Sequence, residues 1–236
     1  MSASIVPLSK DNHKHIKVLD QVDTSVVEGQ QLVPLAAQEI ARAAVVFPVV
    51  YVKDANTGTF RLVAMCGLKP GENLFVENGE WLSVYIPAAL RNLPFQLGRN
   101  EDGDKTQAFV CINENSSLVD DSGIALFEES GDESEFLKSR TAMLAQYDAD
   151  VKMTEGYISY LVENELLVQK SIALNFTENE QFNLNGIYTI DEEKLAGLSA
   201  SAFEDMRKRG FLPSIYGHLI SLNQIHSLIL KRQKKS

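Results

Sequence analysis

The spacing of apolar and polar residues predicts antiparallel strands in the first half of the chain. Residues 47–53 (FPVVYVK) and 60–68 (FRLVAMCGL) are rich in β-branched and aromatic side chains, and Asn56-Thr57-Gly58 between them is typical of a turn. A second hairpin is expected where Asn78-Gly79 separates two short apolar stretches. Two later apolar runs complete an expected antiparallel sheet of about five strands: Pro94–Gly98 and Gln107–Ile112.

Helical patterns interrupt this region and then dominate the second half. Short helices are expected at Pro34–Ala44 and Pro87–Asn92, the second because proline suits the first turn of a helix. A heptad-like series then predicts one long amphipathic helix, or two joined near Thr154–Gly156, with Arg140 and Thr154 as exceptions to the apolar pattern. The apolar members of the series are Leu137, Leu144, Tyr147, Val151, Ile158 and Leu161.

The last forty residues predict two helices joined by a short turn. Ser201-x-x-Glu204 has the form of a capping box. Gly210 is expected to end this helix and Pro213 to begin the next. The final helix has an apolar stripe made of Ile215, Leu219, Leu222, Ile225, Leu228 and Ile229.

These elements predict an α+β fold, with an antiparallel sheet in the N-terminal half and a mainly helical C-terminal half packed on it. A further strand pair is expected at 171–176 and 181–189. We expect a single domain with two lobes, a β-rich lobe at 1–115 and a helical lobe at 133–236. An acidic connecting segment at 99–135 links them, and its EESGDESE run is interpreted as a solvated linker and helix start.

Composition narrows the class of protein. The chain has 236 residues, 44% of them hydrophobic, which is ordinary for a globular protein. Its net charge of -10 argues against nonspecific binding to nucleic acid or to anionic membranes. No run approaches the roughly 18 apolar residues of a membrane span, and no secretory signal is seen, so a soluble cytoplasmic protein is expected. Cys66 and Cys111 lie among apolar residues and are expected to be buried free thiols.

The chain lacks the common motifs of nucleotide, serine-hydrolase and zinc sites. His13 and His15 alternate on a stretch expected to be extended and close to a mobile end. His218 and His226 are not spaced as a helical metal pair, and structural roles are expected for both. We therefore expect no metal and no cofactor.

Several stretches together resemble one family. In the first half these are Gly67-Leu68, Gly71-Glu72-Asn73-Leu74-Phe75, Tyr85-Ile86-Pro87, Leu90-Arg91 and Pro94-Phe95. In the second half they are Asn185-Gly186, Gly210-Phe211-Leu212-Pro213 and 218–222. This pattern, from about Val33 to Ile229, resembles the SapC family of proteobacteria, which is named after a gene at a surface-layer locus and is distinct from the inner-membrane permease of the same name.

The resemblance implies no established activity. Members of that family are thought to accompany surface-export or outer-membrane uptake systems, flavin-dependent tryptophan halogenase-like proteins and cupin-type hydroxylases. The resemblance therefore implies an accessory or peptide-handling role with a peptide or protein partner.

Three functions follow as hypotheses. The first is a non-enzymatic binding module, because Glu and Arg can pair with peptide termini while Trp and Tyr supply contact area. The second is an enzyme on peptides or small amides that uses Glu72, Arg91 and His218. The third is a helix-turn-helix DNA-binding regulator, which the acidic charge disfavours, so we expect no nucleic acid. The candidate binding residues are Lys69, Glu72, Asn73, Trp81, Tyr85, Arg91 and His218.

Structural roles are the alternative for these residues. Asn73 is then a cap of its own turn, Trp81 is a core residue, and Arg91 forms an ion pair with Glu72. The sequence gives no indication of oligomeric state.

Overall fold

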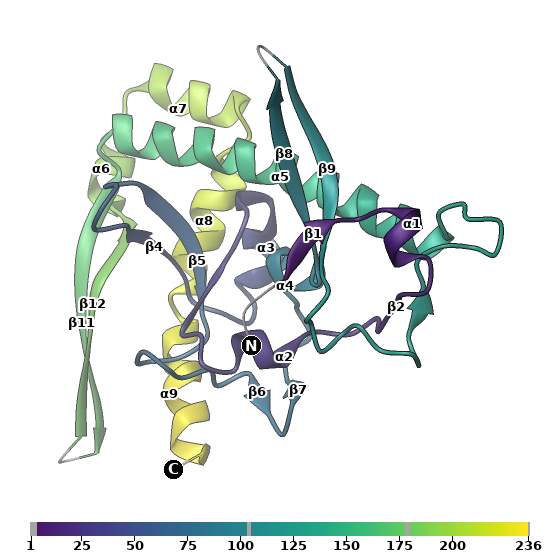
Figure 1. Cartoon of the computed structure of the whole chain (residues 1–236). Coiled ribbons are helices and arrows are strands. Elements are labelled where there is room, and N and C mark those ends of the chain that lie inside the picture. The colour runs from purple at the N-terminus through teal and green to yellow at the C-terminus, as the bar shows by residue number, and fades with distance from the viewer. Residues whose placement is uncertain (1–3, 103–104, 178–179, 236) are drawn as a thin grey trace. The chain divides into compact units, whose positions relative to one another are not determined.

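A computed structural model shows the fold of this chain (Figure 1). It describes residues 4–102, 105–177 and 180–235. The predicted α+β class is confirmed, and every strand pair in these ranges is antiparallel.

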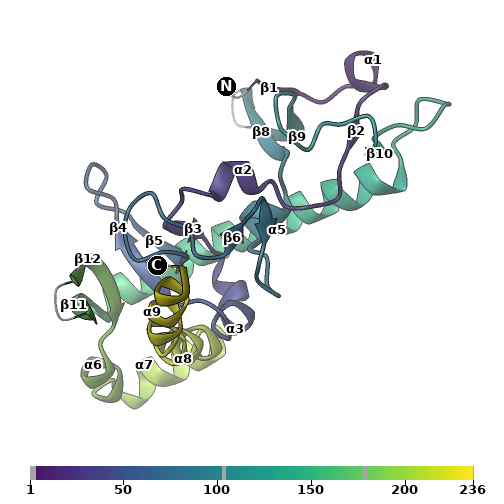
Figure 2. The same ribbon diagram turned by 90° about the horizontal axis from the view of Figure 1, so that it is seen from below.

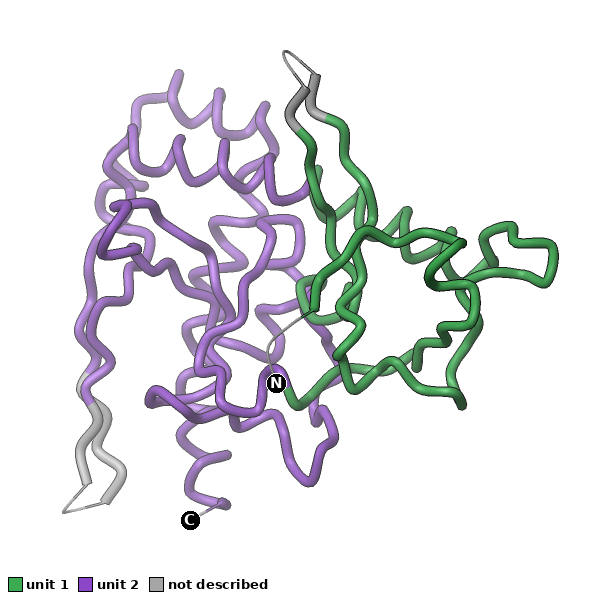
Figure 3. The backbone as a smooth tube through the Cα atoms, viewed as in Figure 1, with its two compact units in different colours: residues 1–25, 88–149 green, residues 26–87, 150–236 purple. Residues whose placement is uncertain are grey.

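The chain divides into two compact units (Figure 3). Unit 1 comprises residues 1–25 and 88–149, and unit 2 comprises residues 26–87 and 150–236. Each unit takes segments from both halves of the chain, whereas the pattern predicted lobes that are continuous in sequence.

Unit 1 is built on a three-stranded sheet in the order β1-β9-β8. Its strands are β1 (Ile5–Pro7), β8 (Phe95–Asp102) and β9 (Lys105–Asn113). Smaller elements of the unit are α1 (Lys10–His13), β2 (Lys17–Val18), α4 (Ala88–Arg91) and β10 (Ile124–Ala125). The core of the unit gathers Ile16, Val18, Phe95, Ile112, Leu118, Leu126, Phe127, Leu137 and Leu144.

His13 corrects an expectation within this unit. It lies at the end of α1 and is 1% exposed, not on an extended mobile stretch. Its Nδ1 lies 3.0 Å from Ser9 N, and its Nε2 lies 3.3 Å from Glu114 Oε1. The alternating pattern misled because a single helical turn carries too few residues to show a helical period.

Unit 2 is built on a five-stranded sheet in the order β11-β12-β4-β5-β3. The predicted hairpin at 47–68 is confirmed, with Tyr51 opposite Leu62. The predicted strand pair at 171–189 is also confirmed, although its tip lies outside the described residues. The strands are β3 (Leu32–Pro34), β4 (Val49–Lys53), β5 (Phe60–Met65), β11 (Leu167–Thr177) and β12 (Glu180–Ile190).

The expectation that the N-terminal strands form one sheet is wrong. β8 and β9 belong to unit 1, and the five-stranded sheet is completed by β12, which pairs with β4 through Ile187 opposite Val52. Tyr188 packs edge-on against Phe60, with ring centroids 4.9 Å apart. Apolar alternation indicates which face of a strand is buried, but it does not indicate which strand lies alongside.

A second, two-stranded sheet confirms the Asn-Gly hairpin. β6 (Val76–Glu77) and β7 (Glu80–Trp81) pair across Asn78 and Gly79, whose φ angles are 52° and 79°. Two positive φ angles in succession are the geometry of a type I′ turn, which glycine and asparagine adopt at least cost. This hairpin follows the GENLF segment, residues 71–75, directly.

The helices lie near their predicted positions, but the single final helix expected from Pro213 to Ile229 is wrong, because the structure has two helices there, Leu212–Ser221 and Gln224–Lys235. The long helix is a single one of 29 residues, α5 (Glu135–Glu163), which runs from the residues of unit 1 into those of unit 2, as α2 (Thr24–Val27) also does. The remaining helices belong to unit 2 (Figure 2): η1 (Ala37–Glu39), α3 (Ile40–Ala43), α6 (Glu192–Ala196), α7 (Ala200–Lys208), α8 (Leu212–Ser221) and α9 (Gln224–Lys235). No helix in the described ranges has the length and apolar character needed to cross a bilayer.

The capping box at Ser201 is wrong, because α7 begins two residues earlier than the motif requires. Ser199 is the N-cap, and its side chain accepts the amide hydrogen of Ala202. Gly210 has a φ of 73° just after α7, and Pro213 lies in the first turn of α8, so both of these predictions are confirmed. Cys66 and Cys111 are free and buried as expected, and burial raises the pKa of Cys66 to about 12.

His218 fixes α8 to the sheet of unit 2. Its Nδ1 lies 2.8 Å from the carbonyl oxygen of Val49 on β4, and its Nε2 accepts the amide hydrogen of Ile190 on β12 at 3.1 Å. Because Nε2 is an acceptor, the proton of the neutral ring must be on Nδ1, which donates to Val49. Ser221, one turn later, accepts the amide hydrogen of Val49 at 2.9 Å.

The stability of the protein should therefore depend on the protonation of His218. Burial lowers its pKa to about 4, whereas an unfolded histidine titrates near 6.5. As the pH falls from 6.5 to 4, His218 becomes protonated in the unfolded chain but stays neutral in the folded chain. The free energy of unfolding therefore decreases over this pH range. We expect His218→Gln to remove roughly 2 kcal/mol of this loss, measured by urea unfolding at pH 7 and pH 4.5. If the free energy of unfolding changed equally with pH in the wild type and in the variant, His218 would not be the source of this pH dependence.

Candidate functional site

The GENLF segment folds back on the chain that precedes it. The amide of Leu74 donates to the carbonyl oxygen of Cys66 at 2.7 Å, and Cys66 itself donates to Gln31 at 2.7 Å. A side chain at Gly67 would place its Cβ only 2.2 Å from the carbonyl oxygen of Glu72. Glycine at position 67 therefore permits the close backbone contact that shapes this turn.

Glu72 holds the turn with both oxygens of its carboxylate. Oε2 accepts the amide hydrogen of Leu68 at 2.8 Å, and Oε1 accepts from Nη1 of Arg232 on α9. The two side chains are 14% and 10% exposed, so water screens the pair only weakly. The sequence analysis did not predict this contact between the turn and the last helix.

Asn73 acts within the turn, where both ends of its carboxamide bond to the backbone. Its Nδ2 donates to the carbonyl oxygen of Val27 at 2.9 Å, and its Oδ1 accepts the amide hydrogen of Phe75 at 2.9 Å. The residue is 7% exposed. Asn73 therefore caps its own turn, which was the structural alternative for this position.

An aromatic cluster extends from the turn to the β6–β7 hairpin. Phe75 stacks on Trp81 with ring centroids 6.1 Å apart, and it packs edge-on against Phe47 at 4.6 Å. Lys231 of α9 lies over the Phe75 ring at 4.8 Å, a favourable cation–π geometry. Trp81 donates from Nε1 to the carbonyl oxygen of Tyr85 at 3.1 Å. The turn, the hairpin and α9 thus share one set of contacts.

Glu39 is a buried carboxylate that the sequence interpretation did not single out. It is 2% exposed, and its Oε1 accepts the Tyr85 hydroxyl hydrogen at 2.7 Å. Its Oε2 accepts the amide hydrogen of Ala36 at 2.9 Å. The available signal was a glutamate three residues after Ala36, the residue that precedes the helical turn, which is the spacing at which a side chain reaches back to a helix start.

A cavity of about 350 Å³ opens beside the turn. It brings together Lys69, Glu72 and Asn73 from the sequence prediction with two basic residues from α9. Its lining residues are Glu28, Lys69, Gly71, Glu72, Asn73, Leu74, Val76, Arg232 and Lys235. We call the surface formed by this cavity, the β6–β7 hairpin with the loop 82–87 that follows it, and α9 the turn face.

Two predicted site residues do not belong to the turn face. His218 is 0% exposed, and backbone groups occupy both of its ring nitrogens. Arg91 belongs to unit 1, where its carbonyl oxygen accepts from Arg140 Nη1 at 3.0 Å. The expected ion pair of Arg91 with Glu72 is wrong, because the partner of Glu72 is Arg232.

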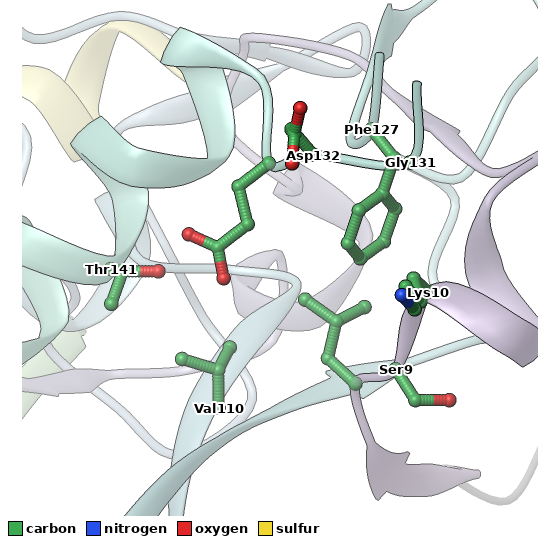
Figure 4. A pocket seen from close by; sticks show the side chains of 9 residues that line it. Ser9, Lys10, Val110, Phe127, Gly131, Asp132 and Thr141 are labelled. Atoms are coloured by element: carbon green, nitrogen blue, oxygen red, sulfur yellow. The ribbon is translucent and has the colours of Figure 1, made fainter. Parts of the chain in front are cut away.

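The described residues give little support for a metal site or for a site in unit 1. They contain no group of three or more His, Cys, Asp or Glu side chains arranged to hold a metal ion. Unit 1 has a cavity of about 430 Å³, and Figure 4 shows Val110, Phe127 and Thr141 lining it beside Asp132. That cavity is not lined by any of the candidate binding residues that were predicted from the sequence.

Comparison with known protein families identifies this chain's family. The family model described as SapC matches residues 8–228 of this chain. No curated protein and no solved structure matches it.

The close contact at Gly67 gives a direct test of the turn geometry. We expect Gly67→Ala to lower the free energy of unfolding by about 1–3 kcal/mol, because the added Cβ must displace the backbone of Glu72. Gly29→Ala is the matched control, since a Cβ there meets no atom within 4 Å. Urea unfolding measures both, and equal effects of the two substitutions would contradict the geometry described for the turn.

Proposed function

This chain belongs to the SapC family, and from that premise we propose that it is a non-enzymatic accessory protein that binds a protein partner through the turn face. We place the partner among proteins of surface export, outer-membrane uptake or peptide modification, which the family resemblance implies. Two free buried cysteines accord with a reducing compartment, and the cytoplasm is the location we propose.

The observation that carries the proposal is the exposed apolar loop of the turn face. Leu82 and Val84 are 44% and 95% exposed, and they follow directly on the half-buried Trp81. The amide of Leu82 donates to the carbonyl oxygen of Phe75 at 2.8 Å, which holds the start of the loop against the aromatic cluster. Exposed apolar side chains beside a fixed aromatic anchor are typical of the centre of a protein interface.

The charges around this loop suit the rim of such an interface. Lys69 and Glu28 are exposed at the cavity and have opposite charges. Lys235 donates to the carbonyl oxygen of Val76 at 2.8 Å and remains exposed. Charges at an interface rim contribute more to orientation and association rate than to affinity. A folded partner with complementary charges around an apolar centre would fit this surface.

The two alternatives receive less support. An enzyme that uses His218 needs a ring nitrogen that can exchange a proton with a substrate, and backbone groups hold both nitrogens. A DNA reader needs a helix that presents Arg, Lys, Asn or Gln to the bases, whereas α8 contains none of these residues and its histidine, His218, is buried. Arg232, which could have contacted phosphate, pairs instead with Glu72.

Substitution of the exposed loop tests the proposal. We expect the double variant Leu82→Asp, Val84→Asp to lose its partner, because a carboxylate at an interface centre must be desolvated without a counter-charge. The loss should be at least about 30-fold in affinity, as for interface hot spots. The measurement is quantitative affinity purification from the native host, followed by titration of the recovered protein.

Ile220→Asp is the matched control, since Ile220 is 65% exposed on α8 and lies outside the turn face. It should retain the partner at wild-type affinity. If the double variant and the control recover the same proteins in the same amounts, the turn face is not the binding surface.

A further inference from the structure

A second cavity in unit 2, of about 540 Å³, lies outside the turn face at the start of α8. Segments far apart in the sequence line it, from η1 and α3, from the second half of α5 and from the turn between α7 and α8. The residues that matter most are Ala37, Ala41, Met153, Gly156, Arg209 and Phe211. This volume falls within the range of small-ligand pockets.

Hydrogen bonds and aromatic contacts fix the base of the cavity. The amide of Ala37 donates to Thr154 Oγ1 of α5 at 2.8 Å, and its carbonyl oxygen accepts from Ser214 Oγ of α8 at 3.1 Å. Phe211 packs edge-on against Tyr157 and Tyr160 of α5, with ring centroids 5.2 and 5.3 Å apart. One residue of η1 thus ties two helices together, so the cavity is formed before any ligand arrives.

The wall of the cavity contains an exposed methionine and a glycine that packing does not explain. Met153 is 51% exposed, and its flexible thioether can adapt to different apolar shapes. Gly156 lies within α5, where glycine weakens a helix, yet a Cβ at this position would meet no atom within 4 Å. Because Gly156 lines the cavity, any larger side chain there would occupy space that is now open.

Arg209 is the one charged residue among those that line the cavity. Its Nε donates to Asp205 Oδ2 at 2.9 Å, and its guanidinium lies 5.4 Å from the Tyr160 ring centroid. Its two terminal nitrogens have no hydrogen-bond partner in the described ranges. A guanidinium held at one nitrogen and open at the other two suits a carboxylate of a ligand.

We propose that this cavity binds the C-terminal end of a peptide whose last residue is apolar. The apolar side chain would contact Met153 and Phe211, and the terminal carboxylate would accept hydrogen bonds from Arg209. Gln38 also lines the cavity and is exposed, and its carboxamide can bond to a backbone amide of the peptide. A simple fatty acid would leave that carboxamide without a partner, which favours a peptide.

Defined peptides test the site on the full-length protein. The probes are acetyl-Ala-Ala-Ala-X peptides with X as Val, Leu, Ile, Met or Phe, each as the free acid and as the carboxamide, titrated by NMR or calorimetry. We expect at least one free acid to bind about tenfold or more tightly than its carboxamide, the difference of one charge-assisted contact. Arg209→Gln should abolish that difference, whereas Arg207→Gln, a control on α7 that does not line the cavity, should preserve it.

Gly156 supplies an independent pair of variants. Gly156→Trp should fill the cavity and eliminate binding while circular dichroism stays native, and Gly156→Ala should retain binding and raise the melting temperature. No binding by any free acid up to about 5 mM, equal binding of acids and carboxamides, or binding of octanoate alone would each overturn the proposal. The turn-face variant should bind these peptides normally, so this site and the proposed function can fail separately.

Discussion

The turn face depends on one carboxylate. Glu72 accepts the amide hydrogen of Leu68 within its own turn and a guanidinium hydrogen of Arg232 from the last helix. The contact with Arg232 joins two residues that are 160 positions apart in sequence. α9 also buries Ile225 and Leu228, and the Lys231–Phe75 and Lys235–Val76 contacts described above are made by flexible lysine side chains. The cavity, the aromatic cluster and the position of α9 therefore depend in part on the contacts of Glu72.

Because the Glu72–Arg232 pair is nearly buried, it can contribute more to stability than a surface ion pair. Exposed pairs such as Arg207–Glu204 are screened by water and contribute little to stability. When one partner of a buried pair is removed, the other remains as an uncompensated charge in a poorly solvated place. The two proposed binding surfaces differ in the state of their arginine. Arg232 is paired with Glu72, whereas the terminal nitrogens of Arg209 remain open to a ligand.

Local features of this fold could be predicted from the sequence, whereas contacts between distant segments could not. The Asn78-Gly79 hairpin, the Gly210 helix end and α5 follow from backbone preferences and periodicity, which act over a few residues. The pairing of β12 with β4, and of Glu72 with Arg232, depends on which segments meet in space. For the same reason the clustering of Lys69, Glu72 and Asn73 in one turn could be recognised from the sequence, while the contact of Arg232 with this turn and the position of Arg209 at the second cavity could not.

The most direct test of this account is a double-mutant cycle on Glu72 and Arg232. Unfolding free energies are measured for the wild type, Glu72→Gln, Arg232→Gln and the double variant. If the pair supports the turn face, the coupling energy should be about 2–4 kcal/mol, the magnitude of a largely buried pair. A coupling energy below about 0.5 kcal/mol, as for an exposed pair, would show that the turn and α9 do not depend on each other.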